Sequence, residues 1–135
     1  MFKIWENLAT ASMFEATPEG WIVVDVRDFS DISKETDMAI ERIRLIGGLI
    51  ANGWKVVIRC VAGINRSNVF ACATMCMLQP EDDLDDSWNK HWELIREKVP
   101  RAQPTMELYD TVKKALWGTK RFKYWRDSKL GGDGL

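Results

Sequence analysis

The sequence has few histidines and cysteines and no net charge of note, and each shortage excludes a class of protein. The single histidine, His91, excludes mechanisms and metal sites that need several imidazoles. The three cysteines, Cys60, Cys72 and Cys76, are odd in number and close together, which argues against a disulfide framework and for a reducing, cytoplasmic setting. The formal net charge of −1 favours neither nucleic acid nor a membrane as partner.

Long apolar runs are also absent. No stretch approaches the roughly 20 apolar residues that span a bilayer. Charged residues interrupt the apolar residues at the N-terminus, which is unlike a signal peptide. Apolar residues nevertheless make up 46% of the 135 residues, so we expect one domain with a substantial core.

The first half of the chain predicts a strand–helix–strand unit. Residues 21–26 are rich in β-branched side chains and predict a buried strand, and residues 54–59 predict a second one. Between them, residues 33–51 have the apolar spacing of an amphipathic helix, with Ser33 as a possible N-cap. A crossover of this length indicates two parallel strands, and therefore an α/β fold.

The second half predicts three helices and a tail. The stretch 68–78 is apolar on every side, which is typical of a helix at the centre of a domain. The acidic run 81–86 is interpreted as the solvated start of a third helix. His91 lies beside the apolar stripe of this helix and is interpreted as a structural residue. A fourth helix follows from Thr105 to about Leu116. We expect residues 1–117 to form the domain and the basic segment 118–135 to be a partly flexible tail, and we interpret the seven tryptophans as packing residues.

One loop, within VVIRCVAGINRSNVF at residues 56–70, combines the features of an anion site. It lies between a predicted strand and the buried helix, so its amides and the positive end of the helix dipole can converge on one point. Gly63 permits the required turn, and Arg66 supplies a planar fork suited to two phosphate oxygens. The predicted phosphate-binding residues are Val61, Ala62, Gly63, Ile64, Asn65 and Arg66.

Cys60 stands at the start of this loop, where the same positive field stabilises a thiolate. The Ser67 hydroxyl is placed to hydrogen-bond the Cys60 sulfur. A phosphate cradle that coincides with an activated nucleophile predicts phosphoryl transfer through a cysteinyl-phosphate. The alternative is a buried structural cysteine in a strand-to-helix turn, but that would not call for Gly63 and Arg66.

These residues match a known family. CVAGINRS resembles the Cys-x-x-Gly-x-x-Arg-Ser/Thr signature of the dual-specificity protein phosphatases, within the cysteine-dependent protein tyrosine phosphatase superfamily. WIVVDVRD resembles the strand and loop that carry the general acid of the family, and the segment 92–116 is similar to its closing helices. The resemblance covers residues 21–116. It implies one domain with a mostly parallel sheet flanked by helices, no metal or other cofactor, and two-step hydrolysis of phosphomonoesters.

The sequence departs from the family pattern in two places. Arg59 precedes the cysteine, at the position where the family usually has histidine. Arg59 could supply positive charge there, but not the hydrogen bond that the histidine makes. Because side chains alternate along a strand, we expect Arg59 to face away from the phosphate. Only 59 residues precede Cys60, fewer than is usual, so the resemblance implies a minimal catalytic core that lacks some N-terminal strands or a recognition segment.

Three aspartates are candidates for the general acid that the leaving oxygen needs. Asp28 is favoured because it lies on the predicted loop at the spacing that the family implies. Asp25 lies within the apolar run and has a structural alternative as a partner for Arg27 or for loop amides. Asp31 could instead cap the helix that follows.

Two other functions remain open. The segment VVDVRDFSD also resembles the Asp-Val-Arg stretch of rhodanese sulfurtransferases, although their loops are usually shorter. A phosphate-binding protein without turnover is the second alternative, because Arg59 replaces histidine. The uncharged loop residues Val61, Ala62, Ile64 and Asn65 favour a singly phosphorylated protein side chain as substrate, either phosphotyrosine or phosphoserine/threonine.

Overall fold

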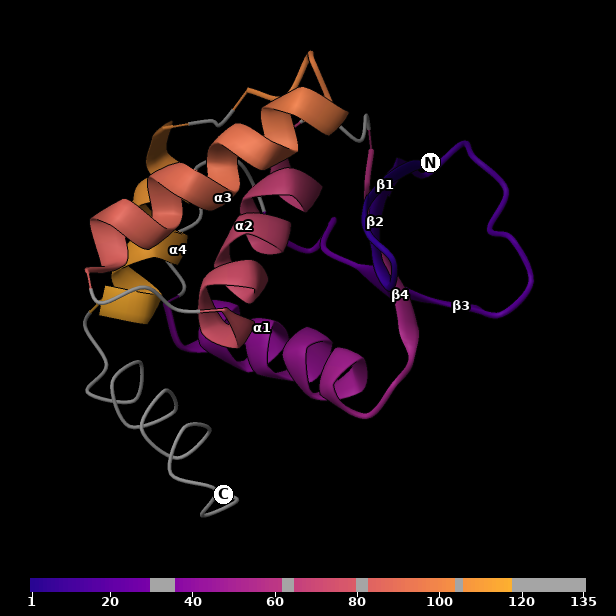
Figure 1. Ribbon diagram of the computed structural model, residues 1–135, viewed down its shortest axis with the longest axis horizontal. Helices are drawn as coiled ribbons and strands as arrows, with labels where there is room; N and C mark the ends of the chain where they lie inside the picture. Colours follow the sequence, from indigo (N-terminus) through magenta and orange to yellow (C-terminus); the bar gives the residue numbers. More distant parts are fainter. Residues whose placement is uncertain (30–35, 62–64, 80–82, 104–105, 118–135) are drawn as a thin grey trace.

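The structure is a computed structural model that describes residues 1–29, 36–61, 65–79, 83–103 and 106–117. Its strands are β1 (Phe2–Trp5), β2 (Leu8–Ser12), β3 (Trp21–Asp25) and β4 (Lys55–Cys60). Its helices are α1 (Thr36–Ala51), α2 (Arg66–Leu78), α3 (Leu84–Lys98) and α4 (Met106–Trp117). Figure 1 shows the helices together on one side of the sheet.

Strand β4 lies inside the sheet, whose order is β1-β2-β4-β3. Both β2 and β3 run parallel to β4, whereas β1 is antiparallel to β2. Ser12 is therefore the register partner of Cys60, and Asp25 is the partner of Arg59. Because parallel strands end at the same edge, the loops that follow β2, β3 and β4 meet there, where α/β proteins place their ligand sites.

Alternation along β4 divides the two faces of the sheet. Val56, Ile58 and Cys60 point into the main core with the helices. Val57 points to the opposite face, where it packs with Ala9 and Ala11 in a second, smaller cluster. The strand is rich in β-branched residues because both of its faces are buried.

Helix α2 is the centre of the helical layer, since its residues from Ser67 to Met77 are all buried. It contacts the other three helices as well as β2 and β4. A buried hydrogen bond from the Thr10 hydroxyl to the Asn68 side-chain oxygen, 3.0 Å long, joins β2 to the first turn of α2. The start of α2 is therefore fixed against the sheet.

The predicted α/β fold is confirmed, and so is the parallel β3–α1–β4 unit. Helix α1 ends where expected, since Gly53 follows it with a φ of 90°. The acidic run does begin a helix: the Asp83 carboxylate accepts the Asp85 backbone N–H at 2.8 Å. Ser33 and Thr105, the other expected caps, and the tail 118–135 lie outside the described residues.

Strands β1 and β2 were not predicted from the sequence. Short runs such as Leu8–Ser12 have small side chains with weak strand preference, and the pairing of β2 with β4 decides its conformation.

The interpretation of all seven tryptophans as packing residues was wrong for at least one of them: Trp88 is fully buried, but Trp54 is 54% exposed. In the described part of the chain, no helix is long and apolar enough to cross a membrane.

Candidate active site

Cys60 is the last residue of β4 and is only 2% exposed. Its Sγ lies 3.4 Å from Oγ of Ser67, the expected contact, across the start of the loop that joins β4 to α2. Ser67 is itself buried. A hydroxyl at this position can donate to a thiolate and stabilise its charge.

The start of α2 is suited to an anion. Asn65 is its N-cap residue but makes no side-chain capping bond, and the first turn contains no acidic residue. The first N–H groups of an α-helix have no partner within the helix, so they are available to a ligand at its positive end. Val61 is fixed from the other side, because its carbonyl oxygen accepts the backbone N–H of Met13 at 3.3 Å. The predicted cradle residues Ala62, Gly63 and Ile64 lie outside the described residues.

Arg66, the first residue of α2, reaches across to the loop that follows β3. Its Nη1 donates hydrogen bonds to the carbonyl oxygens of Phe29, at 2.9 Å, and of Arg27, at 3.3 Å. The guanidinium has further N–H groups on its other nitrogens, which a phosphate could use. Arg66 thus links the predicted phosphate loop to the loop that carries Asp28.

Asp28 is held by a forked ion pair with Arg42 of α1. The two Asp28 oxygens accept from Nη1 and Nη2 of Arg42 at 2.9 and 2.5 Å. These hydrogen bonds lower the pKa of Asp28, against a smaller opposing effect of burial. Arg42 also donates to the Asp25 carbonyl oxygen at 2.5 Å and lies over the Phe29 ring. Asp28 is therefore ionised near neutral pH in this conformation.

Asp25 has a different set of partners, and they match its structural alternative. Its carboxylate accepts from the backbone N–H of Arg27 at 2.9 Å and from Nε of Arg27 at 2.7 Å. It also forms an ion pair with Nη2 of Arg59 at 3.6 Å. The third candidate, Asp31, lies outside the described residues.

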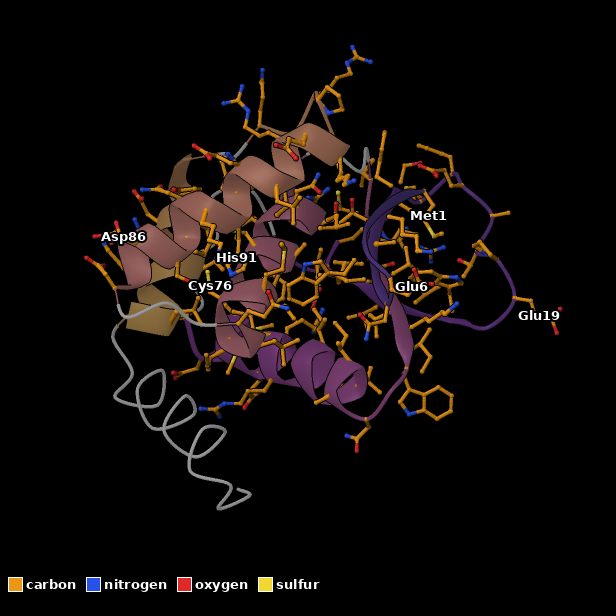
Figure 2. The ribbon with its side chains drawn as sticks, in the orientation of Figure 1. Met1, Glu6, Glu19, Cys76, Asp86 and His91 are labelled. Carbon is orange, nitrogen blue, oxygen red and sulfur yellow. The ribbon has the colours of Figure 1, made fainter. Side chains whose placement is uncertain are left out.

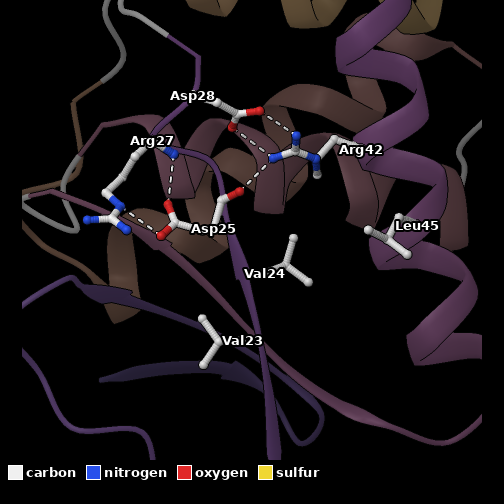
Figure 3. A pocket seen from close by; sticks show the side chains of 7 residues that line it. All are labelled: Val23, Val24, Asp25, Arg27, Asp28, Arg42 and Leu45. Atoms are coloured by element: carbon white, nitrogen blue, oxygen red, sulfur yellow. Dashed lines mark hydrogen bonds and ion pairs between the residues drawn. The ribbon is translucent and has the colours of Figure 1, made fainter.

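A groove of about 720 Å³ adjoins these aspartates, between β3 and α1. Figure 3 shows its ion pairs, with Arg42 reaching Asp28 and the Asp25 carbonyl while Arg27 closes on the Asp25 carboxylate. Cys60 is not among its described lining residues. Its described lining residues are Val23, Val24, Asp25, Arg27, Asp28, Arg42 and Leu45. Sequence reasoning missed Arg42, whose place on the polar side of α1 carries no chemical signal of its own.

The other titratable core groups belong to the packing of the helices. Nε2 of His91 lies 2.9 Å from the Gln79 carbonyl oxygen, and its ring meets that of Trp5 edge to face. Figure 2 shows His91 and Cys76 among the helices, whereas Glu19 points outward. In the described ranges, no three His, Cys, Asp or Glu side chains gather closely enough to hold a metal ion.

Comparison with known proteins shows a likeness of fold to a solved structure but no matching sequence. No protein-family model matches the sequence, and no curated protein has a matching sequence. The structure is similar to the crystal structure of Tk-PTP, a protein tyrosine phosphatase, in its active form, with a TM-score of 0.50 and 24% identity. The fold is protein tyrosine phosphatase-like. The match covers 59% of this chain and spans about half of that protein, 51% of its length.

Proposed function

We propose that this protein is a cysteine-dependent phosphomonoesterase of the protein tyrosine phosphatase type. The observation that carries the proposal is the pairing of Cys60 with Ser67, 3.4 Å apart, at the uncapped start of α2. A buried thiol at the positive end of a buried helix whose first residue is Arg66 has what is needed to attack a bound phosphate. The protein tyrosine phosphatase-like fold supports this assignment.

In the proposed first step, the Cys60 thiolate attacks phosphorus and the bond from phosphorus to the ester oxygen breaks. Arg66 and the amides at the start of α2 bind the phosphoryl oxygens, whose charge they stabilise in the transition state. The Ser67 hydroxyl stabilises the thiolate before attack and again when the sulfur leaves. Water then attacks the cysteinyl-phosphate, which releases inorganic phosphate and restores Cys60.

Asp28 is the proposed acid and base of these steps. As a carboxylate it can take a proton from water in the second step. To act as the acid in the first step it must be protonated, and its pairing with Arg42 opposes this. A dianionic phosphate ester bound nearby offsets the charge of Arg42 and raises the pKa of Asp28, so substrate binding itself favours the acid form.

The proposed substrate is a phosphorylated protein side chain. The predicted loop has no charged residue between Cys60 and Arg66, so nothing in it is suited to a second phosphate group. Both phosphotyrosine and phosphoserine/threonine are included, as in the dual-specificity phosphatases. A panel of phosphopeptides that differ only in the phosphorylated residue would separate the two preferences.

Replacement of the nucleophile tests the proposal directly. Cys60→Ser should abolish hydrolysis of 4-nitrophenyl phosphate while phosphate and vanadate still bind, because Arg66 and the helix amides remain. Turnover near the rate of the unmutated protein would exclude the cysteinyl-phosphate mechanism. Transfer of sulfur from thiosulfate to cyanide, measured on the same preparation, would instead identify a sulfurtransferase, and phosphate binding without turnover would leave a phosphate-binding protein.

The acid is tested with two leaving groups. Asp28→Asn should lower kcat by roughly 10²–10⁴ on phenyl phosphate and much less on 4-nitrophenyl phosphate, whose leaving group needs little protonation. If Asp25→Asn gives this dependence on the leaving group and Asp28→Asn does not, the acid is Asp25.

A further inference from the structure

The ends of β3 and β4 are joined by side chains on the face of the sheet opposite to Cys60. Asp25, the last residue of β3, is the register partner of Arg59, and their side chains form an ion pair with a distance of 3.6 Å between Oδ2 and Nη2. The backbone is joined at the same level, since the N–H of Val26 donates to the Arg59 carbonyl oxygen at 2.9 Å.

Each member of this pair is a close chain neighbour of a proposed catalytic residue. Arg59 directly precedes Cys60, and Asp25 precedes Asp28 by three positions. The Asp25 carboxylate also holds the side chain and the backbone N–H of Arg27, the residue immediately before Asp28. One carboxylate therefore connects the residue before the nucleophile with the residue before the proposed acid.

Arg59 acts from behind the sheet. Cys60 points into the main core, so the alternation of the strand turns Arg59 to the other face, as the sequence predicted. Nε of Arg59 is buried and has no hydrogen-bond partner among the described residues, whereas Nη2 of the same guanidinium forms the ion pair with Asp25. The arginine thus spans to the neighbouring strand, toward the Asp28 loop.

We infer that Asp25 and Arg59 form a positioning pair that sets the distance between the Cys60 loop and the Asp28 loop. This role rests on the proposed function, and it assigns to Arg59 the task of aligning nucleophile and acid without touching substrate. Both side chains are partly exposed, 30% for Asp25 and 26% for Arg59, so the pair contributes little to stability. Misplacement of a catalytic group by about 1 Å, by contrast, can lower a rate about 100-fold.

The distinguishing experiment is a double-mutant cycle with Arg59→Met, Asp25→Asn and both together. Each single variant should lower kcat on phenyl phosphate about 10-fold or more, with a smaller loss on 4-nitrophenyl phosphate and KM within about twofold, because the acid is misaligned but the phosphate cradle is intact. The double variant should lose no more than the worse single variant. Arg59→Lys should retain more activity than Arg59→Met.

The matched control is Lys55→Met, which removes a cation from the other end of β4 on the same face, where it lies over Trp21. Its kcat should be unchanged, and the thermal midpoints of all these variants should lie close together. The falling limb of the pH–rate profile should persist in Asp25→Asn, because Asp25 is a positioning residue here and not the acid.

Two results would overturn the inference in distinguishable ways. In the first, the unmutated protein turns over normally, but the losses of kcat in the cycle are strictly additive or are equal on both esters. This result would exclude the positioning pair and leave the proposed function standing. No turnover of either ester by the unmutated protein would remove the proposed function and this role with it.

Discussion

Nη1 of Arg66 donates a hydrogen bond to the carbonyl oxygen of Phe29, 2.9 Å away. The arginine at the start of α2 is therefore bound to the loop that carries Asp28. A phosphate that draws the remaining N–H groups of Arg66 toward Cys60 would act on a side chain that already contacts this loop. We therefore expect binding of substrate and placement of the proposed acid to be linked through Arg66.

Arg66→Lys should therefore lose more activity than expected for a substitution that keeps the positive charge. An ammonium cannot fork onto two phosphate oxygens, and it cannot at the same time hold the Phe29 carbonyl oxygen. We expect kcat on an aryl phosphate to fall by roughly 10²–10³, the usual cost of removing a donor to developing negative charge. Exposed Arg96→Lys on α3 is the control, and a near-normal rate for Arg66→Lys would place Arg66 outside the site.

Arg42→Met should move the pH dependence. Hydrogen bonds from Arg42 lower the pKa of Asp28, so their removal raises this pKa. A general acid is lost as pH rises through its pKa, and the falling limb of the kcat profile should therefore shift to higher pH. Arg96→Met removes the same charge from an exposed position on α3 and should leave the limb in place. An unmoved limb in Arg42→Met would mean that Asp28 is not the group that titrates there.

Thr10→Val should destabilise the protein without changing its shape much. The substitution removes the donor to the Asn68 side-chain oxygen, which is buried in the first turn of α2. Loss of this buried hydrogen bond should cost about 0.5–1.5 kcal/mol, which urea denaturation would measure. Thr74→Val is the matched control, because the Thr74 hydroxyl only bonds a carbonyl oxygen of its own helix, that of Phe70. Equal losses in the free energy of unfolding of the two variants would show that the hydrogen bond between β2 and α2 contributes no more than one within a single helix.

Alkylation should distinguish Cys60 from the other two cysteines. Cys72 and Cys76 are fully buried inside α2, so the reagent cannot reach either sulfur in the folded protein, although burial raises the pKa of Cys72 and a hydrogen bond with Cys72 lowers the pKa of Cys76. Cys60 is also nearly buried, but it is the last residue of β4, at the sheet edge where the loops after the parallel strands meet. Iodoacetamide should modify Cys60 alone, and phosphate should protect it, as mass spectrometry of the intact protein would show. Modification of Cys60→Ser before unfolding would contradict this selectivity.

Much of the fold could be predicted because the apolar pattern of each element agrees with its place. Helix α2 is apolar all round and is buried all round, and the β-branched runs of β3 and β4 form the parallel pair. Strand β2 could not be predicted, since Ala9 and Ala11 have little strand preference and are small because they lie in the tight cluster around Val57. That cluster exists only after the sheet has formed.

The contact between Cys60 and Ser67 could be predicted for a similar reason, whereas the partners of the aspartates could not. Cys60 and Ser67 are close in sequence, so a strand-to-helix turn brings their side chains together. Arg42 and Asp28 are 14 residues apart on different elements, and their ion pair depends on how α1 is rotated against β3. No local pattern encodes that rotation.

Strand β3 lies at an edge of the four-stranded sheet, whereas β4 has a hydrogen-bonded neighbour on each side. Amide hydrogens of an edge strand exchange with solvent through smaller openings than those of an interior strand, because fewer contacts must break. Local opening on warming should therefore reach β3, the strand that leads to Asp28, before it reaches β4, the strand that leads to Cys60. We therefore expect the proposed cleavage of poor leaving groups to be lost at a lower temperature than the proposed binding of phosphate.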